Sequence, residues 1–370
     1  MTGPGARGAM GDVLGIGLSH YPPLSGRDEG MSGILRWTLD DPAIPAERKD
    51  PRHWPEPMRR EWGDDAGTTS AGEHRRALVA SFERLRAALD EFSPDVVVIW
   101  GDDQYENFRE DIIPPFCVLA YEDREVRPWV SAQHSSDMEG RPNIWGEPRE
   151  TSLTVRGHRE VALHLVGSLL AQGIDVAYAY QPLHHEGFAH AFLNTVLYLD
   201  YHRRGFPYPV VAFPVNCYGR RVISFRGFLS RFADRRPFDP PSPSPGRLIE
   251  LGAATARALR ETDWRVALVA SSSWSHAFLC DKTWRLYPDM DSDRRLFVAL
   301  ERGDYAAWQK VTLDELEDAG QQELLNWFAL IGAMDELGRA PTWTTMVESH
   351  VFNSNKVFAL FEPRPAVHGR

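Results

Sequence analysis

The segment PDVVVIWGDDQYENF, residues 94–108, carries an apolar run that ends abruptly in polar residues. Four aliphatic residues and a tryptophan in succession are typical of a strand that is buried on both faces of a sheet. Two other segments have the same form, VLGIGLSH at 13–20 and RVALVASSSWSH at 265–276. In α/β proteins the carboxyl ends of such strands border the crevice where ligands bind. The sequence therefore predicts that these three polar ends carry the chemistry of the protein.

The rest of the chain alternates strand-like apolar runs with segments of helical periodicity, which indicates an α/β fold. Helices are expected over 71–91, about 152–172, 190–201 and 246–260, and further strands over 115–121, 176–180 and 209–215. Residues 290–338 are expected to be mainly helical, followed by short strands over 342–350 and 356–362. The prediction is a central, mostly buried sheet with helices on both faces. Because the proline-rich segment 237–246 has ordinary loop length, residues 1–370 are expected to form a single domain.

Composition excludes several classes of partner. A net charge of -11 disfavours nucleic acid and anionic membranes, because both are bound through basic patches. No apolar run approaches the roughly 18 residues of a membrane-spanning helix. The three cysteines are widely spaced and odd in number, which fits neither a zinc site nor a disulfide framework and favours the cytoplasm. No phosphate-binding glycine motif supports nucleotide chemistry.

Each polar strand end has a structural and a functional interpretation. His20 is followed by two prolines that hold the chain extended, so its imidazole either faces a crevice or only hydrogen-bonds its neighbours. Residues 101–108, GDDQYENF, either offer oxygen ligands to a hard cation or form a solvated turn. His276 follows small serine residues that either leave room for a ligand or form a turn into a helix.

Two more segments contain ionisable residues in apolar surroundings. LHHEGFAHAF, residues 183–192, has three histidines, but His185 and His190 are five apart, whereas the zinc-protease motif places its histidines four apart. Each of these histidines either enters a pocket or lies in the loop before the next helix. Glu323 lies among apolar residues in AGQQELLNWFALIGA, residues 319–333. Its carboxylate either faces solvent or is buried with a partner or a cation.

Together these segments resemble the class III extradiol ring-cleavage dioxygenases in order and context, from about Gly15 to Met334. That family binds iron(II) through two histidines and one glutamate, a facial triad that leaves open positions. The resemblance implies a soluble enzyme with a metal pocket at the strand ends, and it implies a small aromatic substrate and dioxygen. It places His20 and Glu323 on the metal and assigns His276 as the acid/base. It also implies that His185, with His184 as the alternative, is a further pocket histidine that hydrogen-bonds the bound oxygen or substrate.

The chain departs from the family at the second histidine ligand. Relatives have a histidine after an aspartate at the end of the second strand, and Gln104 takes that position here. A glutamine oxygen is a neutral and weaker ligand than imidazole. Asp103 and Glu106 are alternative oxygen ligands. The expected metal ligands are therefore His20, Gln104 and Glu323.

Three functions follow from this pattern. The first is an iron(II) dioxygenase that opens the ring of a catechol or an o-aminophenol. The second is an enzyme of the same fold with different metal chemistry. The third is a metal-free binding protein like the Memo proteins. The presence of both His20 and His276 favours an enzyme, because a binding module needs no acid/base beside a ligand cluster. The sequence does not specify the exact substrate or whether the ring is cleaved in the proximal or the distal position. It also leaves the oligomeric state open, and a homo-oligomer is one possibility.

Overall fold

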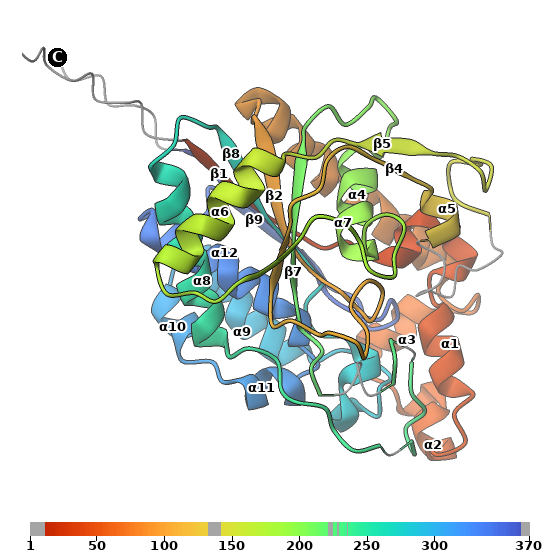
Figure 1. Ribbon diagram of the computed structural model, residues 1–370. Coiled ribbons are helices and arrows are strands. Elements are labelled where there is room, and N and C mark those ends of the chain that lie inside the picture. Colours follow the sequence, from red (N-terminus) through yellow and green to blue (C-terminus); the bar gives the residue numbers. More distant parts are fainter. Residues whose placement is uncertain (1–11, 132–141, 221–224, 228, 235, 364–370) are drawn as a thin grey trace, which may run out of the picture.

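In the computed structural model, residues 12–131, 142–220, 225–227, 229–234 and 236–363 are described. Their centre is a six-stranded sheet in the order β7-β2-β8-β1-β10-β9 (Figure 1). Its strands are β1 (Val13–Leu18), β2 (Val96–Asp102), β7 (Val210–Val215), β8 (Val266–Ser271), β9 (Trp343–Val347) and β10 (Lys356–Phe361). Strands β7, β2, β8 and β1 are parallel, whereas β10 is antiparallel to both β1 and β9. The predicted α/β sheet is confirmed, and the C-terminal strands extend it.

Two small sheets lie outside the central one. The first pairs β3 (Cys117–Leu119) with β6 (Ala177–Ala179), and the second pairs β4 (Arg124–Val126) with β5 (Leu153–Val155). The helix expected over about 152–172 therefore begins later, at Arg159, because the residues before it are extended and pair with β4.

Helices cover both faces of the central sheet. The α-helices of the described residues are α1 (Gly33–Leu39), α2 (Ala46–Lys49), α3 (Glu56–Trp62), α4 (Thr68–Phe92), α5 (Pro128–Ser131), α6 (Arg159–Ala171), α7 (His190–Leu199), α8 (Pro245–Arg260), α9 (Met290–Glu301), α10 (Tyr305–Gln309), α11 (Leu313–Asp318) and α12 (Leu325–Glu336). In Figure 1, α6, α8 and α12 lie to the left of the sheet and α4 and α7 to its right. Alternate strand residues face two separate apolar cores, so the predicted burial of the sheet on both faces is confirmed.

Helices α8 and α12 pack so closely that glycine is required at their contact. A Cβ atom at Gly252 would lie 1.8 Å from the carbonyl oxygen of Ala329, and one at Gly332 would lie 2.1 Å from that of Ile249. Because both obstacles are backbone atoms, no side-chain rotation relieves the clash.

We expect Gly252→Ala to lower the free energy of unfolding by about 3 kcal/mol or more, at the upper end of the cost of overpacking. Chemical denaturation measures this change. Gly246→Ala, in the same helix with no atom within 4 Å of its Cβ position, is the matched control and should be neutral or slightly stabilising. Equal stability of the two variants would contradict this account of the contact.

The parallel strands bring distant residues to one edge of the sheet. Leu18, the last residue of β1, is in register with Ser271, the last residue of β8. Ser271 is also in register with Gly101 of β2, so Asp102 ends its strand beside them. The segments containing His20 and His276 leave the sheet at this same edge. The site is built there.

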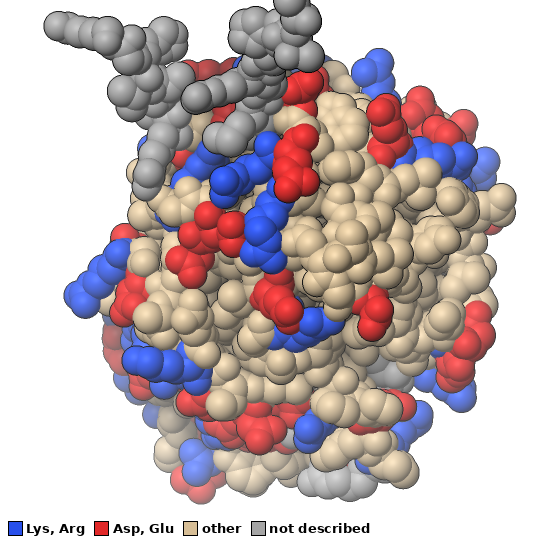
Figure 2. All heavy atoms as spheres, turned by 60° about the vertical axis from the view of Figure 1, so that its left-hand side comes forward, with Lys and Arg blue, Asp and Glu red and all other residues tan. Residues whose placement is uncertain are grey.

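The surface carries charges of both signs. On the face in Figure 2, Lys and Arg side chains are interspersed with Asp and Glu side chains. Among the described residues, no helix combines the length and apolar character needed to cross a membrane.

Candidate metal centre and catalytic pocket

Two imidazoles and a carboxylate meet at the strand ends. Nε2 of His20 lies 3.7 Å from one oxygen of Asp102, and Nε2 of His190 lies 3.9 Å from the other. The two rings lie edge to face with their centroids 5.0 Å apart. Potential ligand atoms of the three residues all lie within 4.8 Å of one another, and all three side chains are buried. This arrangement is suited to a metal ion, because two histidines and one carboxylate form a facial triad.

Hydrogen bonds on the far side of each ring leave its Nε2 facing Asp102. Nδ1 of His20 lies 3.0 Å from Oγ of Ser271, whose hydroxyl donates to the carbonyl of Ala191. Nδ1 of His190 lies 2.8 Å from the Glu106 carboxylate. Both rings are thus held with Nδ1 as the donor, and a neutral ring then presents the lone pair of Nε2.

Asp102 is fully buried, and neither of its oxygens has a hydrogen-bond partner among the described residues. A buried carboxylate without a hydrogen-bond donor is costly. A cation at the centre of the three groups would satisfy all of them. The donor set therefore fits a divalent metal.

A small cavity of about 70 Å³ adjoins the cluster. Its polar wall is formed by His20, Gln104, His190, Ser273, His276, Glu323 and Asn353, and its apolar wall includes Tyr21, Pro22, Pro23, Ile34, Leu229 and Phe278. The cavity thus offers both polar and apolar contacts, although its volume is below the roughly 300 Å³ at which typical small-molecule sites begin. The predicted residues His20, His276 and Glu323 are therefore brought together, with His190 and Gln104 beside them.

Glu323 lies at the start of α12, in the 3-10 turn Gln322–Leu324, and its carboxylate is already engaged. One oxygen accepts a hydrogen bond from the Tyr218 hydroxyl and lies 3.2 Å from Nε2 of His276. The other oxygen accepts from the backbone N–H of Ser273. Glu323 is buried rather than on a solvated face. It differs from Asp102 in having partners for both oxygens.

Burial governs the electrostatics of the cluster. It lowers the pKa of His20 well below its ordinary value. Burial also acts to lower the pKa of His190, but the Glu106 carboxylate outweighs it and raises that pKa to about 10. Burial raises the pKa of Asp102 to about 6, and it raises the pKa of Glu323 well above its ordinary value. Two of these carboxyl groups thus resist ionisation in the metal-free protein, and a bound cation would favour their charged forms.

His276 is held in a neutral state. Burial, aided by the ammonium group of Lys356, lowers the pKa of His276 to about 3. A neutral imidazole keeps a lone pair that can accept a proton, but a pKa this low makes His276 a weak base in the metal-free protein, below the near-neutral value that suits a general base.

The polar loop after β2 uses its side chains in three different ways. Asp103 accepts hydrogen bonds from the backbone N–H groups of Glu106, Asn107 and Phe108, so it stabilises its own turn. Glu106 is bonded to His190. Gln104 lines the cavity.

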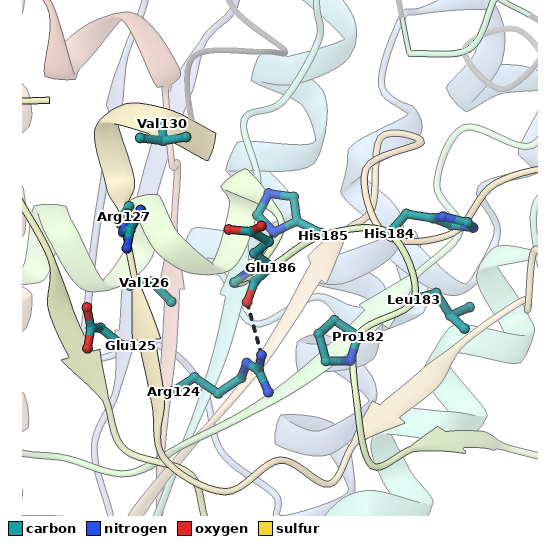
Figure 3. A pocket seen from close by; sticks show the side chains of 11 residues that line it. Arg124, Glu125, Val126, Arg127, Val130, Pro182, Leu183, His184, His185 and Glu186 are labelled. Carbon is teal, nitrogen blue, oxygen red and sulfur yellow. Dashed lines mark hydrogen bonds between the residues drawn. The ribbon is translucent and has the colours of Figure 1, made fainter. Parts of the chain in front are cut away.

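His185 lies in a different place from the other predicted site residues. It lines a groove of about 630 Å³ between β4 and residues 182–187, where Arg124 donates to the carbonyl of Glu186 (Figure 3). Its Nδ1 accepts from the backbone N–H of Gly187, and burial lowers its pKa. His184 extends in another direction and lies 2.9 Å from Asp111. The cavity beside His20 does not include His185 among the described residues of its wall.

Three residues of the site were not assigned from the sequence, namely Asp102, His190 and Tyr218. Asp102 had a signal, because it ends an apolar strand in the same way as the segment that carries His20. His190 was one of three neighbouring histidines, and the sequence offered no way to choose among them. Tyr218 lies three residues after the end of β7, and no histidine or carboxylate in the residues between them marks that strand end as part of a site.

Comparisons with known proteins point to one family. Residues 239–359 match the family model described as the catalytic LigB subunit of aromatic ring-opening dioxygenase. A 2,3-dihydroxyphenylpropionate/2,3-dihydroxicinnamic acid 1,2-dioxygenase of Rhodococcus jostii is 29% identical over 197 residues, which cover 53% of this chain and 48% of that protein. The protein of the same name from Paraburkholderia phymatum is 27% identical over 311 residues, covering 70% of this chain and 83% of that protein. The chain thus spans about half the length of the first relative and most of the second.

Proposed function

Because the chain carries a LigB family domain and is a distant homologue of class III extradiol dioxygenases, we propose that it opens the ring of a catechol or related aromatic with dioxygen, using iron(II). The observation that carries this proposal is the buried cluster of His20, Asp102 and His190, whose two histidines line one cavity together with His276. The relatives' names refer to catechols with an acidic side chain, and we propose only the shared catechol chemistry for this protein.

We assign the two imidazole ligands of the metal to His20 and His190, with Asp102 as the carboxylate. In this proposal His190, the first residue of α7, supplies the second imidazole. The relatives' histidine for this role is replaced by Gln104, which has no imidazole. Gln104 and Glu323, which the sequence suggested as ligands, remain the alternative and border the same cavity. Two histidines and one carboxylate suit iron(II) better than copper or calcium.

The protein's own groups would handle the protons. Iron(II), when bound, supplies a site for chelation of two adjacent ring oxygens and for electron transfer to dioxygen. His276, which lies in the cavity wall and 3.2 Å from Glu323, would take a proton from a substrate hydroxyl and pass it on later in the reaction. Tyr21, Ile34 and Phe278 would hold the ring by apolar contact.

The first test is the metal content of protein purified without oxygen and reconstituted with iron(II). We expect about one iron per chain, the stoichiometry of a mononuclear facial triad, and loss of that iron in His20→Ala. His202→Ala is the control, because His202 is a half-exposed histidine paired with Glu83 on the surface.

Oxygen uptake with a panel of catechols and o-aminophenols then tests the reaction. Consumption of one dioxygen per ring opened would support the proposal. Iron bound without any uptake would favour other metal chemistry on the same fold. No iron in either protein would favour a metal-free binding function.

A further inference from the structure

Glu106 is a buried carboxylate with a specific partner in the site. Its Oε2 lies 2.8 Å from Nδ1 of His190, and its two oxygens accept the backbone N–H of the same residue at 3.0 and 3.2 Å. Only 9% of its surface is exposed. The carboxylate thus fixes both the first residue of α7 and the orientation of its ring.

The loop after β2 holds Glu106 in place. The carboxylate of Asp103 accepts from the backbone N–H of Glu106 at 2.9 Å and from the next two amides of the turn. The side-chain carbonyl of Asn107 accepts from the backbone N–H of Leu183 at 2.8 Å, which joins the turn to the segment leading into α7. The turn and the helix start are therefore tied together at several points.

The two imidazoles of the cluster have unequal partners. His20 is oriented by the neutral hydroxyl of Ser271, whereas His190 is oriented by a carboxylate. A carboxylate on Nδ1 fixes the tautomer and makes the opposite nitrogen a more basic ligand. His190 would then be the stronger of the two imidazole ligands, and it would take the place of the family's histidine at the position of Gln104.

We propose that Glu106 is a positioning residue that orients and strengthens His190 as a metal ligand. This inference rests on the proposed metal site, and it assigns to Glu106 a role behind the ligand rather than on the metal. The hydrogen bonds of Glu106 to His190, not a contact with the cavity, define that role.

Cobalt(II) titration followed by visible absorption tests this role without any turnover. Glu106→Gln keeps an oxygen acceptor for both N–H groups of His190 but removes the charge. We expect cobalt affinity to fall by about 10–100-fold, the usual cost of losing an outer partner of a ligand, and the cobalt bands to shift. Asp111→Asn is the matched control, because it neutralises the carboxylate of an exposed carboxylate–histidine pair, with His184, at a similar distance of 2.9 Å. The cobalt affinity and the absorption spectrum of Asp111→Asn should equal those of the native protein.

The outcomes separate this inference from the proposed function. Unchanged affinity and spectrum in Glu106→Gln, with native protein that binds cobalt, would overturn the role of Glu106 and leave the metal site standing. Weaker binding in the variant together with no oxygen uptake by the native iron protein would support the role and reject the dioxygenase. Native protein that binds no cobalt would overturn both the role and the metal site. Circular dichroism and thermal unfolding confirm that the variants are folded.

Discussion

Replacing His190 by alanine is expected to abolish stoichiometric iron(II) binding, with a loss of affinity beyond the 10–100-fold that outer-sphere changes cost. The reason is that His190 supplies one of two imidazole nitrogens that face the unpartnered carboxylate of Asp102. Anaerobic equilibrium dialysis with iron(II) measures the effect. Gln104→Ala is the decisive comparison, because it should retain about one iron per chain, as a mononuclear site does.

The opposite pattern would assign the ligand differently. If Gln104→Ala loses iron and His190→Ala keeps it, Gln104 is the ligand, as the resemblance to the family suggested, and His190 is not. Alanine at 190 also leaves Glu106 and Asp102 buried without a cationic neighbour, which destabilises proteins strongly. His190→Gln, which keeps a hydrogen-bonding side chain, provides a second variant in which iron should be lost while the fold is kept.

The second large effect is expected at His276. His276→Ala should retain iron and still bind a catechol, while kcat falls by about 10²–10⁴-fold, the usual contribution of a general acid/base. The imidazole lies in the cavity wall and against Glu323, so its loss removes a proton acceptor from the wall of the proposed substrate site. Oxygen-uptake kinetics measure kcat.

A measurement of catechol binding separates a role of His276 in catalysis from a role in substrate binding. A catechol added without oxygen should change the iron spectrum equally in native protein and in His276→Ala, because chelation needs no acid/base. Loss of the spectral change would mean that His276 serves substrate binding. Native kcat in the variant would remove His276 from the mechanism.

Much of the fold could be predicted because its strands are short apolar runs with polar ends. The runs over 13–18, 95–100, 209–215 and 265–270 all became strands of the central sheet. Their order across the sheet could not be predicted, because nothing in a uniformly apolar strand specifies its neighbour. The start of α6 was wrong by several residues for a related reason: Leu153–Val155 pair with a strand that the pattern did not reveal.

The residues of the candidate site could be predicted only where they lie directly after a strand. His20 and His276 lie just after β1 and β8, and both reach the cavity. His190 reaches the same cavity from the start of a helix, 88 residues after Asp102. Its place depends on the packing of α7 against β2 and β8 and on the bond to Glu106, and these tertiary contacts leave no periodic signal.

The position of β1 constrains how this protein reaches its native state. Strand β1 is synthesised long before its partners, because it lies between β8 and β10, whose residues pair with it from more than 240 positions further along the chain. At typical elongation rates of 5–20 residues per second, β1 waits on the order of tens of seconds before its first partner leaves the ribosome. Until then its apolar residues and both of its edges lack their native partners, and such exposed surface favours aggregation of the nascent chain. Refolding is accordingly expected to be slow, since such distant pairings raise the contact order.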